Sequence, residues 1–176
     1  MTIVLGLVPD LIALVALLLT LRQIRLSNGG NHLPVILEAF KVAHAPDSPC
    51  LGAEKYLLND LARQYPDDCS VTELSGPAYS HALFIGMFFD DLGKAVAHGM
   101  IHEDVVLGSF GPGVVPIWDA LAPYVYRQRE VSSSNFWIYF EDLAARATTR
   151  PSSDIYKALG LRSRQPRRGP HAPSPD

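Results

Sequence analysis

Residues 88–106 read FFDDLGKAVAHGMIHEDVV, and this stretch decides how the chain divides into helices. Its first half continues a helical spacing of apolar residues that begins near Ala78. Gly99 stands where that spacing stops, and a glycine at this place can adopt the left-handed conformation that ends a helix. The pattern therefore predicts a helix over residues 78–98, followed by a new helix that begins after His102.

The same stretch contains the side chains that could form an acid–base or metal site, namely Asp90, Asp91, His98 and His102. Asp91 and His98 would share a helix face, but seven residues place them about 10.5 Å apart along the axis. One metal ion with ligand bonds near 2.0–2.2 Å cannot join two groups at that separation. HEDVV also lacks the second histidine of the H-E-x-x-H zinc motif.

Each of these residues has a structural interpretation instead. Lys94 is placed to pair with Asp90 or Asp91 on the helix surface. His98 would meet the negative end of the helix dipole, and His102 would cap the next helix. The sequence therefore identifies no catalytic, cofactor-binding or metal-ligating residue. The alternative is a membrane-bound, metal-dependent hydrolase that uses the Asp/His cluster of residues 90–104.

The rest of residues 27–161 also shows helical spacing, without a convincing alternating strand pattern. Ser48 and Pro49 are expected to begin one helix, and Gly160 to end the last. This region is predicted to be a small all-α bundle. The expected buried faces are Leu33, Ile36, Leu37 and Phe40; Leu51, Leu58, Leu61, Ala62 and Tyr65; Ala82, Ile85, Gly86, Phe89, Leu92, Gly93 and Val96; Val115, Trp118, Leu121, Ala122 and Val125; and Phe136, Phe140, Leu143, Ala144 and Ala147.

A glycine-rich run, GSFGPG at residues 108–113, is predicted to be a turn between a short helix near 103–108 and the longer helix that follows. It matches neither the Walker A nor the dinucleotide-binding pattern, and it follows no predicted strand. The acidic pair Glu141 and Asp142 lies on the polar side of a later helix. There it could meet solvent or an arginine, the candidates being Arg127, Arg129 and Arg146.

The N-terminal run at residues 2–21 is almost wholly apolar and long enough to span a bilayer. Arg22 and Arg25 follow it, which predicts a single-pass anchor at residues 1–26 with the N-terminus outside and the domain in the cytoplasm. A cleavable signal peptide of a secreted protein is the main alternative, but it would need basic residues before the run and small residues after it. A buried helix of a soluble core is a weaker alternative.

Charge is unevenly distributed along the chain. Residues 28–161 hold nine Lys or Arg and sixteen Asp or Glu, a net charge of −7, whereas residues 162–176 have a net charge of +3. An acidic domain is a poor binder of nucleic acid, so none is expected as a partner. The Pro-rich basic tail at 162–176 is predicted to be disordered. Cys50 and Cys69 lack any disulfide or zinc spacing and are expected to be reduced.

Four segments in order, FFDDLG, HGMIHEDVV, IWDALAPYVYRQR and YFEDLAARA, resemble a group of uncharacterised bacterial proteins that share a domain of unknown function. The resemblance covers most of residues 80–147. It implies an N-terminal membrane helix, a helical cytoplasmic domain and no known reaction or cofactor. In that group an acidic residue commonly caps the short helix where His102 stands.

Two functions remain from the sequence. The first is a membrane-tethered helical interaction module, whose partners would be the lipid bilayer and a protein that the sequence does not identify. The second is the hydrolase that uses residues 90–104. The first is the prediction, because every charged residue in that stretch has a structural role available.

Overall fold

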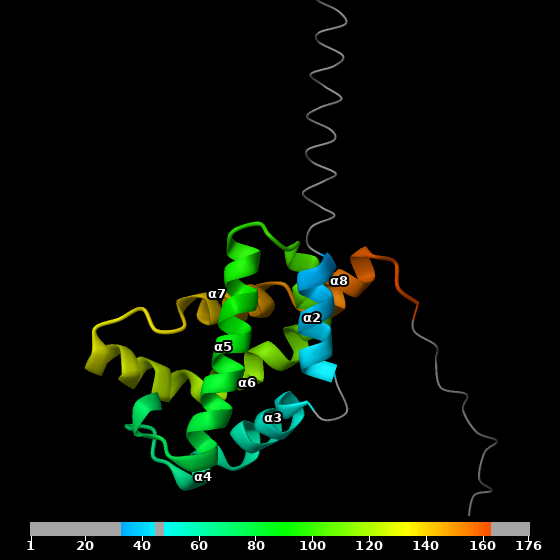
Figure 1. The fold of residues 1–176 in the computed structure, drawn as a ribbon. Helices are drawn as coiled ribbons and strands as arrows, with labels where there is room; N and C mark the ends of the chain where they lie inside the picture. The colour runs from blue at the N-terminus through cyan, green and yellow to red at the C-terminus, as the bar shows by residue number, and fades with distance from the viewer. Residues whose placement is uncertain (1–32, 45–47, 163–176) are drawn as a thin grey trace, which may run out of the picture.

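The computed structural model describes residues 33–44 and 48–162, and these are helical with no strand among them (Figure 1). The all-α prediction is therefore confirmed for this part of the chain. The predicted anchor at residues 1–26 and nearly all of the predicted tail lie outside the described residues. The elements are α2 (Leu33–His44), α3 (Pro49–Asn59), α4 (Leu61–Gln64), the 3-10 helix η1 (Val71–Glu73), α5 (Gly76–Ala97), α6 (Glu103–Ser132), α7 (Ile138–Thr149) and α8 (Ser152–Ala158).

The two long helices α5 and α6 form the centre of the domain (Figure 1). α7 packs against both of them, α3 packs on α5 and α6, and α8 packs on α6. One contiguous core joins these helices, and burying each large apolar side chain in it contributes about 1.5–3 kcal/mol. The largest fully buried side chains are Tyr124, Phe89, Phe140, Leu57, Leu61, Ile85, Leu107, Ile117, Leu121, Leu143, Ile155 and Val71.

α5 agrees closely with its prediction. All seven residues of its expected inward face are buried. The helix ends at Ala97, and Gly99 follows with φ of +66°, in the left-handed region. The backbone N–H groups of Gly99 and Met100 donate to the carbonyls of Val96 and Ala95, which closes the helix end.

α6 corrects the prediction of a turn at residues 108–113, because one helix runs from Glu103 to Ser132. Pro112 lies inside it and has no N–H for the carbonyl of Gly108, one turn earlier. Tyr156 in α8 donates its hydroxyl to that carbonyl at 2.5 Å. Ser152 similarly donates to the carbonyl of Leu107 at 2.6 Å. A helix distant in sequence thus supplies the donor that the proline removes.

α3 begins where it was predicted, but it ends at Asn59, before the last three residues of the predicted stripe, and it buries a different face. Ser48 caps it by accepting the N–H of Cys50 at 3.1 Å, as expected. Leu51 and Leu58, assigned to the core, are 63% and 48% exposed, and the helix instead buries Cys50, Ala53 and Leu57. Cys50 and Ala53 have small side chains, which a search for large apolar residues overlooks. On α2, Leu37 was likewise assigned to the core and is exposed, whereas Ala39 is buried.

By length and composition α6 could also cross a membrane. In the domain it is the central helix, in contact with α3, α5, α7 and α8. It also buries Gln128, whose side-chain oxygen accepts from the backbone N–H and the hydroxyl of Thr72 at 3.1 and 2.8 Å. These features belong to a core helix. Both Cys50 and Cys69 are unpaired thiols, as predicted.

Candidate functional site

The four candidate residues of the 90–104 stretch do not converge. Among the described residues, no group of three or more His, Cys, Asp or Glu side chains could hold a metal ion. Asp90, Asp91, His98 and His102 instead contact different parts of the fold, and each has its own structural role.

Asp90 caps the N-terminus of α7. Its Oδ1 accepts the backbone N–H groups of Tyr139 and Phe140 at 3.0 and 3.2 Å, and Lys94 lies 3.7 Å from its other oxygen. These N–H groups have no partner within their own helix, so a carboxylate supplied by another helix satisfies them. The sequence predicted the Lys94 pair but missed this cap, because Tyr139 is 49 residues away.

Gly86 and Gly93, on either side of Asp90 in the sequence, complete the surface on which α7 packs. A Cβ atom on Gly93 would lie 2.1 Å from the carbonyl oxygen of Tyr139, and one on Gly86 would lie 2.2 Å from the ring of Trp137. Any larger side chain at these positions would therefore push α7 away. The FFDDLG segment thus serves to dock one helix on another.

Asp91 points away from this contact. Its side chain is 72% exposed, and it accepts a hydrogen bond from Lys94 at 3.1 Å. That bond is the main reason that the pKa of Lys94 lies above its ordinary value. The predicted surface ion pair is confirmed, and it leaves Asp91 in an exposed, paired position.

The two histidines mark two helix ends, as predicted. His98 follows the last residue of α5, with Nε2 at 3.3 Å from the hydroxyl of Tyr139. His102 precedes α6, where its Nδ1 accepts the backbone N–H of Asp104 at 3.3 Å. Nδ1 must be unprotonated to accept, so the neutral His102 ring carries its proton on Nε2.

The acidic residues after His102 tie α6 to the end of α7. Glu103 accepts from Arg146 at 2.7 Å, and Asp104 pairs with Arg150. Arg146 also bonds Asp142 at 2.7 Å. The pKa of the Arg146 guanidinium is raised mainly by the hydrogen bond to Asp142 and next by the one to Glu103. On α7, Glu141 meets Arg129 at 2.6 Å, so both acids of the pair lie against arginines.

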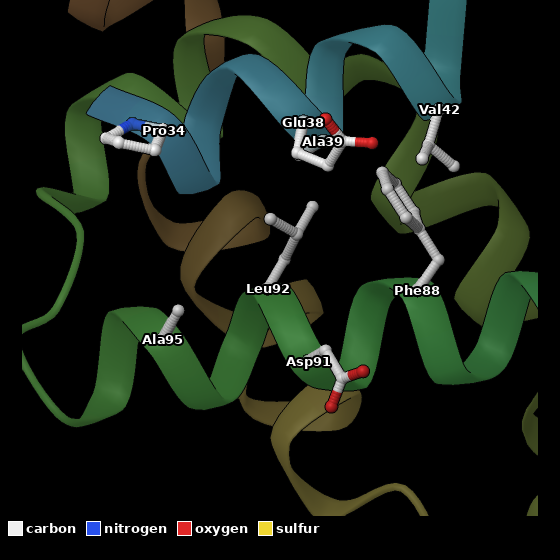
Figure 2. Close-up of a pocket in the computed structure, with 8 residues that line it drawn as sticks. All are labelled: Pro34, Glu38, Ala39, Val42, Phe88, Asp91, Leu92 and Ala95. Atoms are coloured by element: carbon white, nitrogen blue, oxygen red, sulfur yellow. The ribbon is translucent and has the colours of Figure 1, made fainter. Parts of the chain in front are cut away.

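An open groove lies between α2 and α5 (Figure 2). It encloses about 530 Å³ and has mainly apolar walls. Figure 2 shows Leu92 and Phe88 rising from α5 toward α2, from which Val42 faces them. Glu38 and Asp91 are its acidic lining residues, and each is already paired with a lysine of its own helix. The other residues that line it are Pro34, Ala39 and Ala95.

This arrangement suits an apolar guest better than a reaction. Its carboxylates are exposed and paired, so neither is prepared to act as an acid or a base. Its walls can bury apolar side chains that approach from solvent. Sequence reasoning missed the groove, because it treated α5 as having a single packed face.

The family model described as "Domain of unknown function (DUF4760)" matches residues 51–147, more than half of the chain. The chain belongs to the DUF4760 family. The resemblance to a domain of unknown function is thereby confirmed, and the matched residues include all of the segment that carried it. No match to a curated protein or to a solved structure was found.

The DUF4760 region contains nearly all of α3 and extends into α7, so it includes the contact between α5 and α7. It leaves out α2 and α8. One wall of the groove, on α5, therefore belongs to the family domain, and the other, on α2, is supplied by the segment before it.

Proposed function

We propose that this DUF4760 protein is a membrane-tethered interaction module whose groove between α2 and α5 receives an apolar segment of a protein partner. The observation that carries the proposal is the groove itself, open and apolar, with its two acids paired. Apolar grooves between helices commonly accept the apolar face of an amphipathic helix.

The tether rests on the sequence. The apolar run at residues 2–21 is long enough to span a bilayer, and Arg22 and Arg25 follow it. The proposal places the N-terminus outside the cell and the domain in the cytoplasm. α2 begins at Leu33, soon after the run ends, so one wall of the groove would stay close to the membrane.

Fractionation and protease protection test the tether. The protein should remain with membranes through a carbonate wash, and protease added to intact cells should not reach the domain. Release by the wash, or cleavage of the domain from outside, would overturn the proposed location.

Site-specific crosslinking tests the groove. A photo-crosslinking amino acid placed at Val42, which lines the groove, should give a discrete crosslinked product in native membranes. The matched control is Lys41, the neighbouring residue, whose side chain is 74% exposed and which does not line the groove. Equal products from both positions, or none from Val42, would contradict the proposal.

The hydrolase alternative receives no support from the described residues. It would need Asp90, Asp91, His98 and His102 to converge, and they are held at separate helix ends and surfaces.

A further inference from the structure

A second cavity, of about 260 Å³, lies where α2, α3, α5 and α6 meet. The rings of His44, Phe89 and Phe110 form part of its wall, together with the polar side chains of Glu54 and Ser109. The His44 and Phe110 rings are near neighbours, with centroids 6.1 Å apart. This cavity therefore differs from the groove, because it combines aromatic rings with oxygen acceptors.

Glu54 is the unusual group in this cavity. It is half-buried, and its Oε1 faces α6, where a Cβ atom on Gly113 would lie 3.8 Å from it. It makes no hydrogen bond or ion pair with any residue that the structure describes, whereas the half-buried Glu103 and Glu141 each meet an arginine.

Burial raises the pKa of Glu54, because desolvation disfavours the charged form, and the nearby His44 lowers it. The carboxylate therefore lacks a strong cationic partner within the described fold. A bound cation would compensate the charge that burial makes costly.

His44 adds a second acceptor. Its Nδ1 lies 3.2 Å from the carbonyl oxygen of Phe40 and must donate, because a carbonyl only accepts. When the imidazole is neutral, Nε2 is therefore its acceptor. No lysine or arginine is among the described residues that line the cavity, so its polar groups favour a guest with N–H donors.

A metal ion is a poor guest here. Zinc sites use four ligands and calcium sites six to eight, whereas this cavity offers one carboxylate and one imidazole. An organic ammonium ion fits better, since it pairs with a carboxylate and is attracted to aromatic faces.

We infer that this cavity binds a small primary alkylammonium ion, with Glu54 as its counter-ion and the alkyl chain against Phe89 and Phe110. His44 and Ser109 provide further acceptors for the ammonium N–H groups. This site is separate from the groove and takes a different class of ligand. Its test is therefore independent of the test of the interaction module.

The test titrates the full-length protein, purified in lipid nanodiscs, with butylammonium and with 1-butanol, which has a similar shape and no charge. NMR signals from the methyl groups of Ala43 and Leu51, two further lining residues, report binding at the cavity. Butylammonium should saturate these shifts with an affinity about tenfold higher than butanol, as expected for a charge-assisted hydrogen bond.

Substitutions then locate the counter-ion. Glu54→Gln should weaken butylammonium binding about tenfold, since one charged hydrogen-bond partner is lost. Glu130→Gln is the matched control, because Glu130 is exposed on α6 and lines neither this cavity nor the groove. It should leave binding unchanged.

A second variant protects the test against misfolding. Ser109→Trp fills the cavity from an exposed position on α6 and should abolish the shifts while the thermal transition is retained. Equal affinity for butanol and butylammonium, unchanged binding by Glu54→Gln, or an equal loss in Glu130→Gln would overturn the inference.

Discussion

The two sides of α5 meet their neighbours in opposite ways. On one side Gly86, Asp90 and Gly93 receive α7 so closely that backbone nearly touches backbone. On the other side Phe88 and Leu92 hold α2 at a distance and leave the groove open (Figure 2). Helix contacts become tight where glycine removes the side chain, and larger side chains keep the axes apart. α5 thus packs tightly against α7 on one side and leaves an open surface toward α2 on the other.

Gly93→Ala tests the closed side most severely. The new Cβ would lie 2.1 Å from the Tyr139 carbonyl, so α7 must move. We expect a loss of about 3 kcal/mol in the free energy of unfolding, at the upper end for overpacking, despite the better helix propensity of alanine. Urea unfolding followed by circular dichroism measures it.

Gly52→Ala is the matched control for that substitution. Gly52 lies in α3 with nothing within 4 Å of its would-be Cβ, so alanine should stabilise the protein by up to about 1 kcal/mol. Opposite signs at the two glycines are the expected result. A loss at both would mean that the close contact with α7 is not the cause.

The end of α5 gives the next largest effect. Gly99 has φ of +66° and open space around its would-be Cβ, so Gly99→Val introduces backbone strain without a clash. We expect a loss of about 2 kcal/mol, because a β-branched residue is badly suited to the left-handed region. His102→Asp should change stability by less than about 0.5 kcal/mol, since aspartate also caps helices well. Equal losses in thermal melts would place the helix boundary elsewhere.

Asp90 and Asp91 are adjacent in FFDDLG, but Asp90 contacts α7 and Asp91 does not. Substituting each in turn therefore compares the two sides of α5. Asp90→Ala removes the cap of α7 and should cost about 1–2 kcal/mol. Asp91→Ala removes only an exposed ion pair and should cost less than about 0.5 kcal/mol. Chemical denaturation of both variants decides the comparison, and a larger loss for Asp91→Ala would reverse the assignment of the two sides.

The inward face of α5 could be predicted because its signal is local: large and small apolar residues recur at helical spacing, and Gly99 ends the pattern. The role of Asp90 could not, because the N–H groups that it caps belong to a helix some fifty residues later. The prediction broke α6 at residues 108–113 for the same reason. The Gly108 carbonyl, which lacks a donor within the helix, accepts a hydrogen bond from Tyr156, 48 residues later.

The groove was hidden for a different reason. Leu92 was correctly assigned to the inward face of α5, yet it also lines the space beneath α2. Periodicity indicates that a residue faces inward, but it does not give the distance to the helix opposite. The error on α3 is similar, since the burial of Ala53 and the exposure of Leu51 depend on how that helix packs on its neighbours.

Filling the groove should have the smallest effect on the free energy of unfolding. A change in partner binding can therefore be distinguished from a loss of packing. Val42 is half-buried at the edge of the core, but it lines the groove, so the larger ring of Val42→Trp can extend into open space and the free energy of unfolding should change by less than about 0.5 kcal/mol. Lys41→Trp, its exposed neighbour, should behave alike in unfolding. The two should differ in membranes. Val42→Trp should reduce groove crosslinking from a photoprobe at Glu38, another lining residue, whereas Lys41→Trp should not. A large stability loss confined to Val42→Trp would show that α2 closes on α5 as tightly as α7 does, and the contrast between the two sides would fail.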